Sequence, residues 1–253
     1  MSKLIKTPEE IVRIRQSGKI LAGILRRLKA EAKPGIRLIE LEQLTKTLLD
    51  LAGGTPTFLG YRSEGAREPY PFALCTSVNE AVVHGRPSSY TLRPGDILKL
   101  DLGVSWQGGF TDAAVTIPIG KVSGEANRLI QTTKNALVEA IRAVRPGNTV
   151  GDIGFAVHHV VQASGVKVLD GLTGHGVGLE VHEDPIIYNF GERGKGVHLE
   201  EGMVLAIEPM TALTTSKVVQ VADDSFVTAD GSISAHFEHT VLVTKKGAEI
   251  LTS

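Results

Sequence analysis

One pattern occurs twice along this chain, and the repetition restricts the fold more than any other feature. The helix-breaking string Lys33-Pro34-Gly35 recurs 112 residues later as Arg145-Pro146-Gly147, and Glu40 recurs at the same offset as Asp152. A single Pro-Gly stop between two helices is common, but that does not explain several residues matched at one offset. The repetition predicts two similar halves that are related by internal pseudo-two-fold symmetry.

Secondary-structure signals follow the same order in both halves. Capping residues such as Thr7 and Glu10, followed by apolar residues at helical spacing, predict four helices. Their expected ranges are about 8–32, 38–51, 124–144 and 149–163. Strand-like stretches are expected near 75–77, at 81–84 and, as a hairpin, at 96–118. We therefore expect an α+β fold in which an antiparallel sheet is covered by helices, with residues 1–253 forming a single domain.

Composition narrows the classes of function. The chain has 27 basic and 28 acidic residues, so it lacks the charge that nucleic acids or anionic membranes attract. Its single cysteine, Cys75, excludes an intramolecular disulfide and a thiolate-cluster zinc site. The sequence contains neither an apolar signal segment nor an apolar run of membrane-spanning length. We expect a cytoplasmic protein without a membrane or nucleic-acid partner.

Two aspartates lie in the predicted hairpin. Asp101 and Asp112 flank a turn at residues 107–109, so they lie directly or diagonally opposite each other. Two like charges at such a short distance, among apolar strand residues, need a cation or a shared proton. The pair alone is a modest signal, because an aspartate in a hairpin is more often a turn residue or a solvated end.

Three further residues complete a candidate metal-binding set. His175 stands between glycines that allow a close backbone approach. Glu208 precedes Pro209, where a strand must end or bulge, and Glu238 begins another apolar strand. With the two aspartates, this set holds four carboxylates and one neutral imidazole. Its total charge is minus four, and two divalent cations would balance that charge. Such a ligand set suits Mn²⁺, Fe²⁺, Co²⁺ or Zn²⁺, and a pair of these ions can activate water.

The strings that carry these residues resemble those of the methionine aminopeptidases, which have the pita-bread metallopeptidase fold. In order along the chain they are Asn79-Glu80 through His84-Gly85, Leu100-Asp101, Thr111-Asp112, Gly174-His175-Gly176, His182-Glu183-Asp184-Pro185, Ile207-Glu208-Pro209-Met210 and Phe237-Glu238-His239-Thr240. Only 26 residues separate His182 from Glu208. This spacing leaves no room for the helical insertion of the longer type, so the chain resembles the short bacterial type.

The resemblance implies a role for each metal ligand. Asp101 would chelate the first of two divalent ions. His175 and Glu208 would bind the second ion, and Asp112 and Glu238 would bridge both.

The resemblance also implies the reaction. Water activated by the two metal ions would attack the carbonyl carbon of an N-terminal methionine, and Glu208 would carry the proton to the leaving amine. His84 and His182 would hold the scissile peptide and its developing oxyanion. The expected function is removal of the initiator methionine from nascent proteins and peptides when the second residue is small.

The methionine side chain would occupy a pocket next to the metals. The residues implied to line this pocket are Tyr61, Tyr70, Cys75, His84 and His182. Two neighbouring segments, 62–69 and 223–227, depart from the family pattern in length and in aromatic content. A lone cysteine such as Cys75 is more commonly a small buried apolar residue without a functional role.

Two alternative functions stay open. One is an Xaa-Pro aminopeptidase or dipeptidase of the same fold, although such enzymes usually carry a separate N-terminal domain. The other is a non-catalytic module that binds nascent chains, although such relatives typically lose metal ligands. Nascent polypeptide N-termini are the expected partners of a monomeric enzyme, and association with the ribosome is left open.

Overall fold

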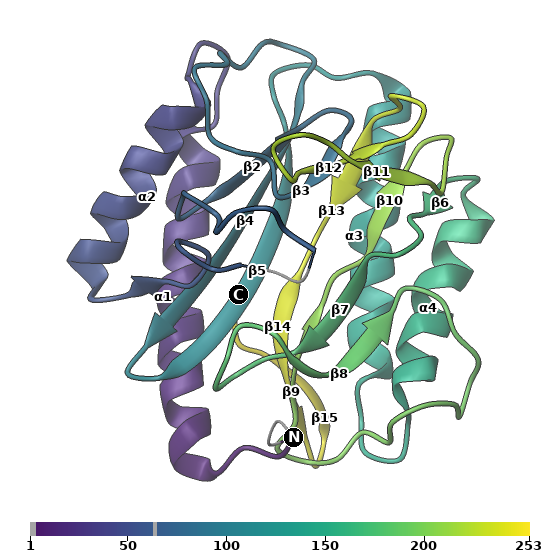
Figure 1. Ribbon diagram of the computed structural model, residues 1–253. Helices are drawn as coiled ribbons and strands as arrows, with labels where there is room; N and C mark the ends of the chain where they lie inside the picture. The colour runs from purple at the N-terminus through teal and green to yellow at the C-terminus, as the bar shows by residue number, and fades with distance from the viewer. Residues whose placement is uncertain (1–3, 63–64) are drawn as a thin grey trace.

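The computed structural model describes residues 4–62 and 65–253. Within these two ranges the α-helices are α1 (Pro8–Glu31), α2 (Leu38–Ala52), α3 (Gly124–Ala143) and α4 (Val150–Ala163). These bounds confirm the predicted helices to within about a residue at each end. Figure 1 shows the first helix pair on one side of the strands and the second pair on the other, as two similar halves would require.

The repeated acid, Glu40 in the first half and Asp152 in the second, caps the start of the second helix in each half. The backbone N–H of Arg37, the residue before α2, donates to Glu40 Oε2 at 2.8 Å. The backbone N–H of Thr149, the residue before α4, donates to Asp152 Oδ2 at 2.9 Å. An acid at this position satisfies a donor at the helix start that would otherwise lack a partner, and its charge suits the positive end of the helix dipole.

The strands pair only in antiparallel ladders among the described residues, in agreement with the predicted sheet. In the first half they are β1 (Thr55–Pro56), β2 (Cys75–Val78), β3 (Ala81–Val83), β4 (Ile97–Trp106) and β5 (Gly109–Pro118). In the second half they are β6 (Lys167–Val168), β7 (Thr173–Gly176), β8 (Glu183–Tyr188), β9 (Val204–Ile207), β10 (Met210–Ala212), β11 (Val218–Gln220), β12 (Phe226–Thr228), β13 (Ser234–His236), β14 (His239–Thr244) and β15 (Gly247–Ile250).

In the described part of the chain the ladders divide into four sheets instead of one continuous sheet. Their orders are β1-β4-β2 with β5 beside β4, then β13-β10-β6, then β11-β12-β3, and finally β15-β14-β9-β7-β8. The pairing of β3 with β12 joins the two halves. Among the described residues, no helix is both long enough and apolar enough to cross a membrane.

The hairpin and the strand break both lie where the sequence predicts them. In the β4–β5 ladder Gly103 faces Asp112 and Asp101 faces Ala114, so the two aspartates are diagonal neighbours. Strand β9 ends at Ile207 and β10 begins at Met210, because Pro209 cannot donate to a ladder. Glu208 therefore lies at an interruption between two strands.

Each half has its own apolar core. The first core lies between α1, α2 and the β4–β5 hairpin and includes Leu21 and Leu100, which are fully buried. The second lies against α3 and α4 and includes Leu129, Ile153 and Leu205, which are also fully buried. Burial of each such side chain contributes about 1.5–3 kcal/mol. These cores hold the strands that carry the candidate ligands.

Two threonine side chains connect the halves along β5. Thr240 Oγ1 accepts from the backbone N–H of Asp112 at 2.8 Å and donates to its carbonyl at 2.7 Å. In the same way, Thr116 Oγ1 accepts from the backbone N–H of His236 at 2.9 Å and donates to its carbonyl at 2.6 Å. Figure 1 shows β5 beside β13 and β14, where these bonds form. Strand β5, which carries Asp112, is thereby held at a fixed spacing from β13 and β14, which flank Glu238.

A buried lysine adds a further connection. The side chain of Lys99 on β4 is 1% exposed, and its Nζ donates to the carbonyls of Asn79 at 2.7 Å and Ser234 at 3.3 Å. Burial lowers the pKa of Lys99 to about 7. Its two carbonyl partners come from opposite halves of the chain, so Lys99 ties β4 to β13.

Candidate metal centre

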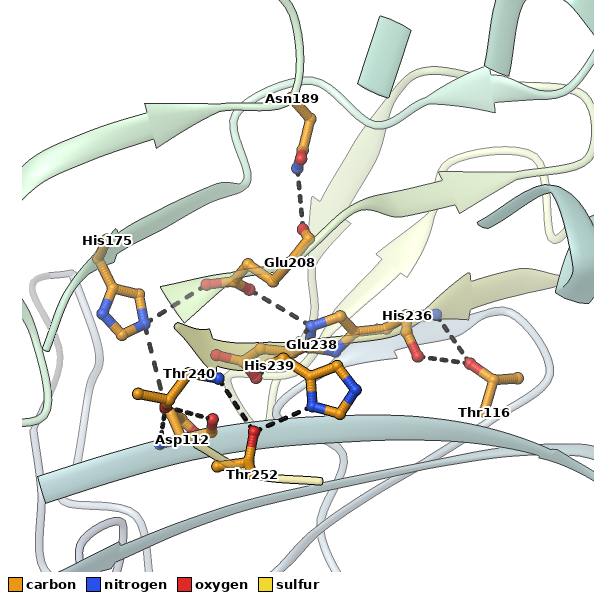
Figure 2. Close-up of polar contacts among 10 residues, drawn as sticks. All are labelled: Asp112, Thr116, His175, Asn189, Glu208, His236, Glu238, His239, Thr240 and Thr252. Atoms are coloured by element: carbon orange, nitrogen blue, oxygen red, sulfur yellow. Dashed lines mark hydrogen bonds and ion pairs between the residues drawn. The ribbon is translucent and has the colours of Figure 1, made fainter. Parts of the chain in front are cut away.

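Five side chains from both halves converge on one buried point. Figure 2 shows four of them together, with His175 and Glu208 facing Asp112 and Glu238. All five are at most 9% exposed. We refer to this set as the metal centre, and its members are Asp101, Asp112, His175, Glu208 and Glu238. The structure therefore brings together every ligand that the sequence predicts.

The spacing within the metal centre suits two adjacent ions. Candidate ligand atoms of Asp101, Asp112 and Glu238 lie within 4.8 Å of one another, and so do those of His175, Glu208 and Glu238. Glu238 belongs to both groups. Between the groups, His175 Nε2 lies 3.4 Å from Glu208 Oε1 and 4.0 Å from Asp112 Oδ2. Two three-ligand groups that share a carboxylate are compatible with a bridged pair of ions.

The carboxylates lack the partners that burial demands. Asp101 Oδ1, Asp112 Oδ1 and Glu238 Oε1 are buried and have no hydrogen-bond partner among the described residues. Burial raises the pKa of Asp112 to about 7. Burial, and next the neighbouring carboxylates, raise the pKa of Asp101, Glu208 and Glu238 well above the ordinary value. Divalent cations would neutralise such a cluster, so the residues fit a metal site.

Glycines allow His175 to reach the cluster from β7. A Cβ atom on Gly174 would lie 2.5 Å from the carbonyl oxygen of Ala206 on β9, and one on Gly176 would clash with the carbonyl of Asp184. Only glycine therefore allows β7 to lie this close to both neighbours. His175 Nδ1–H donates to the carbonyl of Gly176 at 2.9 Å, which directs Nε2 at the carboxylates. Burial lowers the pKa of His175 to about 4, which keeps the imidazole neutral and able to bind a metal.

A cavity of about 840 Å³ opens over the metal centre. All the residues implied to form the methionine pocket line it, namely Tyr61, Tyr70, Cys75, His84 and His182. His182 Nδ1 lies 2.8 Å from Tyr61 Oη, and its ring centroid is 4.5 Å from that of His175. His84 directly follows β3, and burial lowers its pKa. The structure thus gathers both candidate oxyanion-binding imidazoles beside the metal ligands.

One wall of this cavity is apolar. Cys75 packs in a buried cluster with Phe58 and Val181, and Tyr61 and Tyr70 border the cluster. Burial raises the pKa of the Cys75 thiol well above its ordinary value, so the side chain is neutral. Cys75 is therefore both a small buried apolar residue and a residue of the cavity wall. Phe58 was not selected from the sequence, since no motif marks it.

The two segments that depart from the family pattern meet at the rim of the cavity. The backbone N–H of Arg67 donates to Asp224 Oδ2 at 3.0 Å. The guanidinium groups of Arg67 and Arg86 lie 3.8 and 3.9 Å from the same carboxylate. Within segment 62–69, residues 63 and 64 lie outside the described residues. These contacts join two loops from different halves next to the cavity.

His236 also belongs to the site, although no sequence motif marks it. Its side chain is 1% exposed, and its Nε2 lies 3.4 Å from Glu208 Oε2 and 3.9 Å from Glu238 Oε2. Burial lowers the pKa of His236 to about 3. The available signal was its position two residues before Glu238, because side chains two apart in an extended stretch point to the same side. In the structure β13 ends at His236, and Glu238 lies in the short connection to β14.

The fold and this centre together define a metal-dependent enzyme whose carboxylate-rich site lies at the junction of two similar halves. Comparison with known proteins gives the family: the chain belongs to metallopeptidase family M24, whose model matches residues 12–245. The predicted resemblance is confirmed, and membership implies binding of divalent metal ions, as expected from the ligands.

Full-length relatives support the same assignment. A methionine aminopeptidase from Clostridium perfringens is 41% identical over 250 residues, which cover 98% of each protein. The crystal structure of a methionine aminopeptidase from Thermotoga maritima superposes with a TM-score of 0.95 at 41% identity and covers 100% of both chains. Prolidase from Pyrococcus furiosus is more distant, with a TM-score of 0.77 and 26% identity, and this chain covers 65% of it. These similarities confirm the predicted pita-bread fold.

Proposed function

We propose that this protein removes the N-terminal methionine from polypeptides whose second residue is small. The observation that carries the proposal is the position of the metal centre directly beneath a cavity that has an apolar wall. The identity to methionine aminopeptidases over nearly the whole chain supports it. A methionine side chain would pack against Cys75 and its aromatic neighbours while the first peptide bond lies over the carboxylates.

The proposed centre holds two divalent ions, drawn from Mn²⁺, Fe²⁺, Co²⁺ or Zn²⁺. Asp101 would chelate one ion, His175 and Glu208 the other, and Asp112 and Glu238 would bridge. The grouping of candidate ligand atoms, with Glu238 common to two groups, supports this division. When bound, such ions supply an activated water and polarise the carbonyl group of the substrate.

Three side chains would perform the remaining steps. Glu208 would accept a proton from the attacking water at its carboxylate and donate it to the nitrogen of the leaving amine. His84 and His182 would bind the peptide and its carbonyl oxygen as negative charge develops there. Their position in the cavity wall beside the metal centre supports these roles.

Metal reconstitution with defined peptides tests the proposed function. Metal-stripped protein would be loaded with each divalent ion and assayed on Met-Ala-Ser, Met-Lys-Ser, Ala-Pro and Ala-Pro-Ala. We expect cleavage of Met-Ala-Ser only, and only in the presence of metal. Efficient cleavage of the proline peptides would instead identify an Xaa-Pro peptidase or dipeptidase. Full biological activity of an Asp112→Ala variant would indicate a non-catalytic binding module.

The proposal extends to the setting of the enzyme. We propose that residues 1–253 form one catalytic domain, because the metal centre takes ligands from both halves and either half alone would leave it incomplete. The substrates would be the N-termini of nascent polypeptides in the cytoplasm. We propose that the enzyme acts as a monomer, and docking on the ribosome is an option that a co-sedimentation experiment would test.

A further inference from the structure

The fold holds His236 in a defined position beside the metal centre. His236 is the last residue of β13 and faces Met210 of β10 in the ladder. Its backbone N–H and carbonyl both bond to Thr116 Oγ1, at 2.9 and 2.6 Å. Figure 2 shows this pair at one end of the cluster, with the His236 ring directed at Glu208. The position of the imidazole is therefore set by strands from both halves.

Glu208 lies between two imidazoles. Its Oε1 is 3.4 Å from His175 Nε2, and its Oε2 is 3.4 Å from His236 Nε2. Its own backbone carbonyl accepts from Asn189 Nδ2 at 3.0 Å. Each oxygen of the Glu208 carboxylate therefore faces a different histidine, while the main chain of Glu208 is held by Asn189.

Two carboxylates lie within 4.0 Å of the His236 ring, Glu208 and Glu238. Neither ring nitrogen has a hydrogen bond with any residue in the described part of the chain. A buried N–H group without an acceptor is unfavourable. The distance of 3.4 Å from Nε2 to Glu208 Oε2 exceeds the usual N–H···O range of about 2.7–3.2 Å by only a few tenths of an ångström. A small rotation of the glutamate side chain would complete the bond.

We propose that His236 is a positioning residue of the metal centre. In the tautomer with hydrogen on Nε2, it donates to Glu208 Oε2 and leaves Oε1 directed to the His175 side, where the second ion would bind. This inference rests on the metal centre proposed above. Hydrogen bonds from outside the ligand set orient metal ligands and tune the affinity for the ion. His236 would thus control how firmly Glu208 holds one of the two ions.

Calorimetric titration of metal-free protein with Mn²⁺ tests this role without an activity assay. The wild type should bind two ions. His236→Phe keeps a ring of similar size without a donor, whereas His236→Gln supplies an amide N–H at similar reach. We expect binding of one ion to weaken by about 10–100-fold in His236→Phe and to stay within about threefold of the wild type in His236→Gln.

The outcomes separate this inference from the proposal on which it rests. A wild type that binds no Mn²⁺ would overturn the metal centre itself. Two ions bound with unchanged affinity by His236→Phe would overturn the role of His236 alone. Equal weakening in His236→Phe and His236→Gln would overturn donation of a hydrogen bond. His236→Leu repeats the comparison with a smaller apolar side chain in case the phenylalanine prevents folding, and His198→Gln, at an exposed histidine, is the matched control.

Discussion

At the scale of single residues, a buried ion pair holds the loop that carries His182. Lys6 Nζ lies 2.5 Å from Glu183 Oε2, and both side chains are almost fully buried. The other oxygen of Glu183 accepts from the backbone N–H groups of Leu179 at 2.6 Å and Glu180 at 2.9 Å. One carboxylate therefore joins the N-terminal segment to the turn before His182. Its charge is tolerated because the lysine neutralises it.

Removal of the lysine should cost more than removal of the pair. We expect Lys6→Met to lower the free energy of unfolding by about 3–5 kcal/mol, because Glu183 is left as an uncompensated buried charge. The double variant Lys6→Met/Glu183→Gln should recover part of this loss, since the glutamine keeps an acceptor for the two N–H groups. Urea unfolding of the three proteins measures the effect, and equal stability of the single variant and the wild type would contradict it.

At the scale of elements, the side chain of Thr240 performs a function usually supplied by strand pairing. Its hydroxyl bonds to both the N–H and the carbonyl of Asp112, so β14 is fastened to β5 at the residue that would bridge the two ions. Thr116 makes the equivalent pair of bonds to His236. The reciprocal arrangement, in which each half supplies a threonine to the other, follows the internal symmetry.

Loss of the Thr240 hydroxyl should weaken both the fold and the metal centre. Thr240→Val keeps the shape but leaves two buried backbone groups of Asp112 without this partner, at about 1–3 kcal/mol for such unsatisfied groups. We expect a lower free energy of unfolding together with weaker Mn²⁺ binding. The control is Thr244→Val, because the Thr244 hydroxyl bonds to Gly247 on the same hairpin. A loss in the control as large as in Thr240→Val would contradict a specific role at the interface of the halves.

At the scale of the whole molecule, the four carboxyls of the metal centre couple folding to pH and to metal. Their folded-state pKa values are raised above those of the unfolded chain, for Asp112 to about 7. The folded protein without metal therefore binds more protons than the unfolded chain. The associated stability is fully present below the unfolded pKa of about 4 and is lost as pH rises through the folded values.

Metal-free protein should therefore become less stable between pH 7 and 9. In this window the buried histidines His175 and His236 are neutral in the folded protein and largely neutral in the unfolded chain. Lys99, with its lowered pKa of about 7, makes stability rise with pH, but it is one group against four carboxyls. Each carboxyl that stays protonated in the folded protein while it is ionised in the unfolded chain contributes a slope of up to about 1.4 kcal/mol per pH unit. Bound divalent ions favour the ionised carboxylates, so their stabilisation should grow with pH. Thermal unfolding with and without EDTA measures both trends, and a chelated protein equally stable at pH 7 and pH 9 would contradict the prediction.

Sequence alone was sufficient to predict the features that depend on near neighbours and on ordered motifs. The helix starts at Thr7 and Thr149, the diagonal aspartates of the hairpin and the strand break at Pro209 all follow from local geometry, and the structure confirms them. The five ligands could also be predicted, because each lies in a motif and is an acid or imidazole among apolar or glycine residues. The structure brings them together.

Contacts between residues far apart in the chain were decided only by the tertiary structure. Lys6 and Glu183 are 177 positions apart, and Thr240 and Asp112 are 128 apart, so no local pattern relates them. His236 lacked a recognisable motif, and its role depends on the way β13 lies against β10 and β5. Periodicity indicates which face of a strand a residue occupies, whereas the partner across that face depends on how the two halves pack together.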